Sequence, residues 1–266
     1  MPVECGVEIG AVGQERFHAV DRLVMKHAFD IHNTLGRFCD ERIYQDELAY
    51  RCAGDGLDVH REVQIRVLHK GFAKLYYLDL LVESGLVYEL KTAETLNANH
   101  QSQLINYLLL SDTHHGKLVN FRPSSVESRF VSTRLRREDR IVFRIDDRNW
   151  MGQDDADIRL REDLIALLAD WGVFLDVNLY RDALLHLTIG ANGCVQPVEI
   201  RVNDRIVGTH PMNMLRNGSA WHISSLRESL CGYETHLLRL LCHTTLERMH
   251  WINLDHRNVT LQTLTK

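Results

Sequence analysis

The two halves of this chain carry the same residue pattern in the same order. The segment Gly36–Leu48 aligns with Gly172–Leu184, with glycine, phenylalanine, aspartate, tyrosine and leucine at matching positions. Self-similarity that stays in register indicates a repeated structural unit. We therefore expect two tandem copies of one fold, joined by a charged, solvated connection near residues 136–155. Further anchors at an offset that drifts only from 136 to 133 residues are Val63–Val67 with Val198–Val202, Tyr88–Lys91 with Trp221–Ser224, and Leu118–Phe121 with Trp251–Leu254.

The hydrophobic periodicity of the first copy predicts the element order α-α-β-β-β-α-β-β. Apolar residues at spacings of three and four predict helices, whereas alternating apolar and polar residues predict strands. Gly36 is expected to end the first helix, and Glu83–Gly85 to join two strands as a hairpin. The fold class is therefore α/β, with a central mixed β-sheet flanked by helices in each copy. The expected helices are 17–35, 40–52 and 98–110, and the expected strands are 59–68, 75–82, 86–92, 118–121 and 129–135.

The composition argues against several classes of protein. No apolar run in the 266 residues approaches the roughly 20 residues that a membrane span needs, so no membrane partner is expected. The six cysteines are scattered without a CxxC pair, which argues against a zinc ribbon or a disulfide framework and predicts a cytoplasmic protein with reduced thiols. The formal net charge of −5 argues against a strong nonspecific nucleic-acid binder. It is compatible with an enzyme that holds phosphates through metal ions.

The predicted hairpin brings two carboxylates together. A turn centred on Ser84 places Asp79 directly opposite Glu89. Cross-strand Cβ atoms lie about 4.5–5.5 Å apart, and like charges so placed are destabilising. The same face carries Tyr77, Leu81 and Val87, so the two carboxylates project from a surface that is otherwise expected to be core. Such a pair requires a shared proton or a cation between its members.

Lys91 completes this candidate cluster. It lies two residues after Glu89, and therefore on the same face of the strand, with its ammonium beside the carboxylate pair. Mg²⁺ bridging Asp79 and Glu89 would need further oxygen ligands, and the backbone carbonyl of Leu90 is positioned to supply one. Lys91 would then orient the water that attacks a phosphodiester. The alternative is an ordinary edge hairpin in which Lys91 only forms a salt bridge.

Asp79 followed by the run Glu89–Lys91 resembles the D…(D/E)xK signature of the PD-(D/E)XK nuclease superfamily. Residues of about 25–135 are more closely similar to the small bacterial family named for its GxxExxY motif. The resemblance implies restriction-endonuclease-like units, a Mg²⁺ or Mn²⁺ cofactor and a nucleic-acid substrate, with DNA as the expected one. We expect one such unit with an intact site over residues 15–135 and a second unit over residues 156–266.

Other motif positions add to the resemblance. Glu41 and Tyr44 match the GxxExxY motif, whereas Phe38 occupies the position of its glycine, which puts the local turn in question. The resemblance implies that Glu41 completes the metal site. Gln103 and Tyr107 lie four residues apart on the following helix, and so on one face. They resemble the QxxxY motif of RecB-type exonuclease domains, which implies that they position the substrate or the catalytic lysine.

The second copy lacks every proposed site residue. It keeps the apolar pattern, so we expect a degenerate unit without catalytic activity that serves as a docking, dimerising or substrate-clamping surface. The sequence thus predicts a metal-dependent nuclease that acts through its N-terminal unit. The alternative is a non-catalytic nucleic-acid-binding or protein-interaction module that retains the nuclease fold. Asn213, His222 and Ser224 align with Asp79, Glu89 and Lys91, and Val177, His236 and Leu240 align with Glu41, Gln103 and Tyr107.

Overall fold

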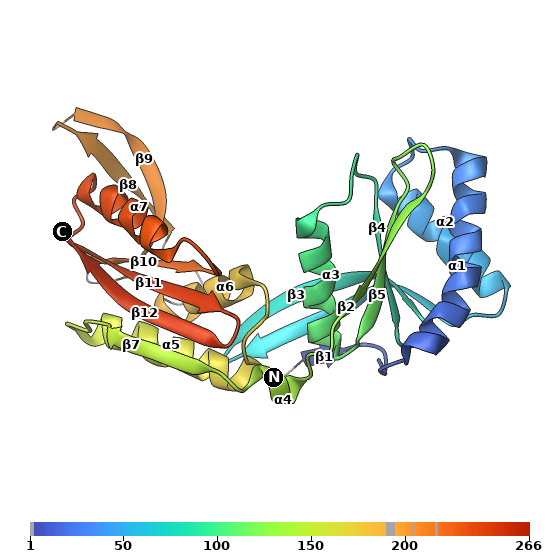
Figure 1. The fold of residues 1–266 in the computed structure, drawn as a ribbon, viewed down its shortest axis with the longest axis horizontal. Coiled ribbons are helices and arrows are strands. Elements are labelled where there is room, and N and C mark those ends of the chain that lie inside the picture. The colour runs from blue at the N-terminus through green and yellow to red at the C-terminus, as the bar shows by residue number, and fades with distance from the viewer. Residues whose placement is uncertain (1–2, 190–194, 204, 216–217) are drawn as a thin grey trace. The chain divides into compact units, whose positions relative to one another are not determined.

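The computed structural model describes residues 3–189, 195–203, 205–215 and 218–266. The chain forms two compact units. The N-terminal unit runs up to Leu68 and includes Ala73–Arg137, and the C-terminal unit comprises His69–Phe72 and Glu138–Lys266. Within the described residues, the strands form two six-stranded sheets, one centred in each unit (Figure 1). No helix in this part of the chain is both long and apolar enough to cross a membrane.

The N-terminal unit follows the predicted order of elements, with one additional short strand at its start. Its strand order is β1-β2-β3-β4-β5-β6. Strands β4 and β5 are parallel, whereas β1–β2, β3–β4 and β5–β6 are antiparallel, so the sheet is mixed, as predicted. The elements are β1 (Val3–Cys5), α1 (Gln14–Leu35), α2 (Glu41–Gly54), β2 (Val59–His69), β3 (Phe72–Val82), β4 (Leu86–Lys91), α3 (Ala98–Ser111), β5 (His115–Asn120) and β6 (Glu127–Ser132).

Helices cover both faces of this sheet (Figure 1). On one face, α1 and α2 pack their apolar stripes against β3, β4 and β5 around a fully buried Tyr44. The predicted end of α1 is confirmed, because Gly36 adopts a φ of 73° that glycine tolerates without strain. On the other face, a Cβ added at Gly116 of β5 would lie 3.0 Å from Leu104 and 3.2 Å from Leu108. Glycine at this position therefore lets α3 approach the sheet closely.

The turn between β3 and β4 fixes the register of the strands that carry the predicted carboxylates. Glu83 and Ser84 both have positive φ, at 51° and 54°, and the turn closes with the Gly85 amide donating to the Val82 carbonyl. A Cβ at Gly85 would collide with the segment of the chain that precedes α1. The resulting pairs follow the predicted register, with Leu80 opposite Tyr88. Continuing that register places Asp79 opposite Glu89.

The C-terminal unit repeats the same order of elements from α5 to β12. One prediction is wrong in part, since the expected solvated connection at 136–155 contains α4 and the strand β7, which pairs in parallel with β12. The sequence of β7 resembles that of a linker because the strand lies at a sheet edge and is rich in charged residues. The elements are α4 (Arg137–Arg140), β7 (Arg144–Asn149), α5 (Asp155–Trp171), α6 (Val177–Ile189), β8 (Val195–Val202), β9 (Arg205–Met214), β10 (Ala220–Ser224), α7 (Leu230–Cys242), β11 (Arg248–Asp255) and β12 (Asn258–Thr265).

The strand registers of the two sheets correspond. Residues of β10 and β11 pair as the equivalent residues of β4 and β5 do, at a shift of 133 positions. In β9 and β10, Asn213 lies opposite Trp221. Continuing this register places Met212 opposite His222, at the position of Asp79. The sequence alignment placed Asn213 there, and the structure corrects it by one residue.

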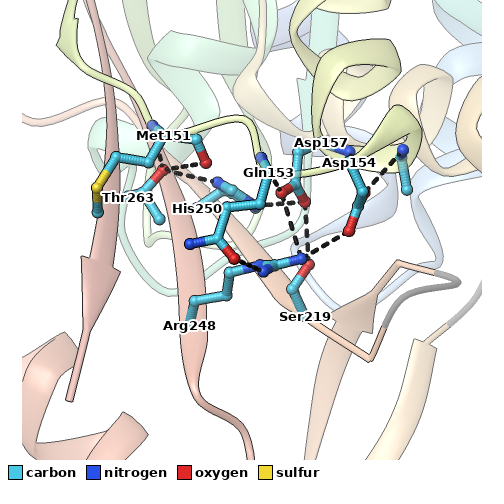
Figure 2. A network of polar contacts seen from close by, with 9 residues as sticks. Met151, Gln153, Asp154, Asp157, Ser219, Arg248, His250 and Thr263 are labelled. Atoms are coloured by element: carbon cyan, nitrogen blue, oxygen red, sulfur yellow. Dashed lines mark hydrogen bonds and ion pairs between the residues drawn. The ribbon is translucent and has the colours of Figure 1, made fainter.

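A buried polar network connects α5 to β11 in the C-terminal unit (Figure 2). Asp157 is fully buried near the start of α5. Its carboxylate accepts a hydrogen bond from the backbone amide of Gln153 at 3.0 Å. The carboxylate also lies 2.8 Å from His250 Nε2 and 3.3 Å from a guanidinium nitrogen of Arg248. The other ring nitrogen of His250 lies 3.0 Å from the Thr263 hydroxyl. The fully buried His250 therefore depends on this carboxylate, whereas Arg248 also contacts Asp154 at 2.7 Å.

We expect Asp157→Ala to destabilise the C-terminal unit by about 1–3 kcal/mol, because it leaves the fully buried imidazole of His250 without its carboxylate partner. Asp155→Ala is the control, since Asp155 lies in the same helical turn but is exposed; it should change stability by less than about 0.5 kcal/mol. Urea unfolding followed by circular dichroism measures both. Equal effects of the two substitutions would show that the network contributes nothing specific.

Candidate active site

The predicted cluster forms around the ammonium group of Lys91. Lys91 Nζ lies 2.7 Å from Glu89 Oε1, on the same strand β4. The same nitrogen lies 4.0 Å from Asp79 Oδ2 of β3 and 3.8 Å from Glu41 Oε1 at the start of α2. Two strands of one hairpin and one helix terminus thus bring three carboxylates within 4.0 Å of the Lys91 ammonium. The hairpin register predicts Asp79, Glu89 and Lys91 together, whereas Glu41 is expected there only from the family resemblance.

Burial makes the negative charges of this cluster unfavourable, which raises the pKa of two of its carboxyls. Glu89 is only 1% exposed, and burial followed by the nearby Asp79 charge raises the pKa of its carboxyl to about 8. Burial also raises the pKa of Asp79 to about 6, although the Lys91 charge and the Leu90 amide oppose this shift. For Lys91, burial alone lowers the pKa, but the Glu89 carboxylate outweighs burial and the net shift is upward. The cluster therefore favours the uptake of a proton or of a further cation beside Lys91.

Two hydrogen bonds fix the position of Asp79. Its Oδ2 accepts from the backbone amide of Leu90 at 2.7 Å, and its backbone carbonyl accepts from Gln45 Nε2 at 2.5 Å. The sequence predicts a role for the Leu90 carbonyl, whereas here the Leu90 amide contacts Asp79, and the contact of Gln45 was not predicted. Gln45 lies four residues after Glu41, on the same face of α2, and this spacing is the signal that points to it.

Gln103 and Tyr107, the predicted pair on α3, are in contact. Gln103 Nε2 donates to the Tyr107 hydroxyl at 3.0 Å. Tyr107 is buried, and burial followed by the charge of Glu89 raises its pKa. His100, at the start of the same helix, accepts from the Asn97 amide through Nδ1 in a capping box. This histidine therefore has a helix-capping role.

The chemistry of the donor atoms in the cluster, although not their spacing, suits a hard divalent cation. The second carboxylate oxygen of Glu89, Oε2, is buried without a hydrogen-bond partner. Carboxylate oxygens are the ligands that Mg²⁺ prefers. Among the described residues, no three His, Cys, Asp or Glu side chains lie close enough together to hold a metal ion. The Lys91 ammonium occupies the centre of the carboxylates instead, so a divalent cation would compete with it for the same oxygens.

The equivalent position in the C-terminal unit has a different chemistry. His222 replaces Glu89, and its Nε2 lies 2.6 Å from the Tyr233 hydroxyl. Burial lowers the pKa of His222, which favours the neutral ring. Ser224 replaces Lys91 and donates to the Asn253 side chain at 2.8 Å. These side chains satisfy one another without a hard cation.

The cluster lies in a recognisable segment of sequence. A search of the curated proteins finds no match for this chain. Residues 18–132, which run from within α1 to the end of β6, match the family model of the PD-(D/E)XK nuclease superfamily. This segment contains Glu41, Asp79, Glu89 and Lys91.

Proposed function

We propose that the N-terminal unit is a metal-dependent nuclease that hydrolyses phosphodiester bonds in nucleic acid, with DNA as the expected substrate. The observation that carries this proposal is the buried Glu89 carboxylate, whose Oε2 has no hydrogen-bond partner and whose neighbours are Asp79 and Lys91. A buried carboxylate pair of this kind is destabilising without a cation. A need for negative charge at this position explains why a carboxylate lies in the core.

Each residue of the cluster has a distinct role in this proposal. Asp79 and Glu89 would hold Mg²⁺ or Mn²⁺, with Glu41 and the Leu90 carbonyl as further ligands. A divalent cation bound there supplies positive charge for the phosphate oxygens and lowers the pKa of water. Lys91 orients the attacking water and stabilises the charge that develops on phosphate. Tyr107, with its hydroxyl held by a side-chain amide of α3, helps position the substrate.

We further propose that the N-terminal unit belongs to the GxxExxY family and that the C-terminal unit is its degenerate copy. The matching element order and strand registers support a duplication. One side-chain contact also recurs, because the Tyr44 hydroxyl donates to Gly36 O at 2.8 Å and the Tyr180 hydroxyl donates to Gly172 O at 2.7 Å. The C-terminal unit would then provide a docking, dimerising or substrate-clamping surface.

The alternative function is a non-catalytic module that binds nucleic acid or protein on a retained nuclease fold. The net charge of −5 favours it, as does the occupation of the cluster by Lys91. Metal binding discriminates between the two functions. Calorimetric titration with Mn²⁺ that detects one site per chain, lost in Asp79→Asn, supports the enzyme, whereas no binding supports the alternative.

Asp79→Asn and Lys91→Ala should each reduce metal-dependent cleavage of DNA by about 10²–10⁴-fold, because one removes a cation ligand and the other the group that orients water. The assay follows a labelled oligonucleotide with Mg²⁺ or Mn²⁺. Asp30→Asn, an exposed change on α1, is the control and should cleave like the wild type. Full activity in both site variants would refute the assignment.

Stability should depend on pH through Glu89. Because folding raises the pKa of this carboxyl from 4.5 to about 8, its contribution is fully present below pH 4.5 and is lost as pH rises through about 8. Glu89→Gln should therefore stabilise the metal-free protein at pH 9 by on the order of 1–3 kcal/mol and abolish stabilisation by Mn²⁺.

Thermal unfolding at pH 6 and pH 9, with and without Mn²⁺, measures this effect. Glu94→Gln is the matched control, because Glu94 is exposed shortly after β4, and it should show neither change. A Glu89→Gln variant that is less stable than the wild type at pH 9 would show that Lys91 compensates the buried charge fully.

A further inference from the structure

We propose that Arg37, Phe38 and Arg122 form a platform on which an unpaired base of single-stranded DNA stacks beside the active site. These three residues are called the Phe38 platform below. The inference rests on the proposed nuclease function and names the form of substrate that the site takes. Phe38 is the position at which this chain departs from the glycine of the GxxExxY motif.

The platform combines an exposed aromatic ring with two positive charges. Phe38 is 75% exposed. The guanidinium carbon of Arg37 lies 5.0 Å from the centroid of its ring, and that of Arg122 lies 5.9 Å from it. In the part of the chain that the structure describes, neither guanidinium has a carboxylate partner. Aromatic rings bordered by such charges are what proteins use to bind single-stranded nucleic acid.

Contacts with the buried Tyr44 hold the loop that carries Phe38 in place. The Tyr44 hydroxyl donates to Gly36 O at 2.8 Å and accepts from the Cys39 amide at 3.1 Å. The Tyr44 ring also stacks on Phe121, with centroids 4.4 Å apart and planes 10° apart. Because Arg122 follows Phe121 directly, this stack ties both sides of the platform together. Phe38 is therefore presented to solvent by a fixed loop.

The platform lies beside the candidate active site. Helix α2, which begins at Glu41, starts three residues after Phe38. On the other side, Arg122 Nε donates to the carbonyl of Thr92 at 3.2 Å, and Thr92 follows Lys91. A strand whose phosphate reaches the carboxylate cluster can thus place a neighbouring nucleotide on the ring.

The C-terminal unit provides an internal comparison. Its equivalent loop keeps a phenylalanine, Phe174, and the same tyrosine-to-glycine hydrogen bond. Its counterparts of Arg37 and Arg122 are the fully buried Val173 and the acidic Asp255. The two positive charges therefore accompany the acidic cluster and are absent where that cluster is replaced, which links them to the nucleic-acid substrate rather than to the loop fold.

The chemistry of the platform favours unpaired nucleotides over duplex. In a duplex, both faces of each base are already stacked, so an aromatic ring gains nothing without separating base pairs. An unpaired base offers a free face, and stacking on an aromatic side chain is sequence-tolerant. The two guanidinium groups can contact the phosphates on either side of that base.

Binding without cleavage tests the platform. Fluorescence anisotropy in EDTA compares a 12-nucleotide thymidine strand with a 12-base-pair duplex. Phe38→Ala should weaken single-strand binding about tenfold and change duplex binding by less than about twofold. Phe38→Trp should restore it, and a double Arg37→Ala, Arg122→Ala variant should lower the salt slope by about 1.4, which is about 0.7 for each phosphate contact.

The matched control is Tyr50→Ala, because Tyr50 is 76% exposed on the same helix that follows the loop. It should leave single-strand binding unchanged. Equal single-strand affinity of the wild type and Phe38→Ala, absence of binding by both, or an equal loss on the duplex overturns the platform.

Cleavage is measured separately, so that the two proposals fail independently. If Phe38→Ala binds like the wild type while Asp79→Asn abolishes cleavage, the nuclease stands and the platform is wrong. If the wild type cleaves nothing but Phe38→Ala still loses single-strand binding, the platform stands and the nuclease is wrong.

Discussion

The parallel pairing of β4 with β5 is the constraint on which the N-terminal unit depends. Parallel neighbours cannot be joined by a tight turn, so α3 must cross the sheet between them, and it brings Tyr107 over the same face as Glu89. The pairing also places Asn120 opposite Lys91. The Asn120 amide donates to Ala93 O at 2.7 Å and its carbonyl oxygen accepts from the Ala93 amide at 3.1 Å. The chain leaving β4 is thereby fixed just beyond Lys91.

Polar contacts that stabilise the fold occur in both units, whereas the candidate catalytic residues occur only in the N-terminal unit. In the C-terminal unit, Asn253 forms the same two hydrogen bonds with the backbone of Leu226. The first helix of the N-terminal unit buries Asp21 against Lys117 at 2.5 Å, and Asp157 and His250 form the corresponding pair. Backbone pairing and these buried contacts hold the fold in both units. The Glu89 cluster is thus additional to what folding requires.

The Glu89 cluster also opposes folding, because burial of its charge is unfavourable without a cation. Glu89 lies 2.7 Å from Lys91, and yet burial raises its pKa to about 8. A position that needed only stability would carry an apolar or neutral residue, as the C-terminal unit does with His222. Sites that sacrifice stability for charge are typical of functional positions.

The sequence by itself determined the order of helices and strands from α1 to β6, the end of α1 at Gly36 and the register that places Asp79 opposite Glu89. These features depend on local periodicity and turn geometry, which neighbouring residues specify. Only the tertiary structure decided that β7 is a strand, because an edge strand gains its hydrogen bonds from β12, more than 100 residues away. It also decided that Gln45 donates to Asp79 and that Arg122 lies near the exposed ring of Phe38, since these contacts join segments that are far apart in the sequence.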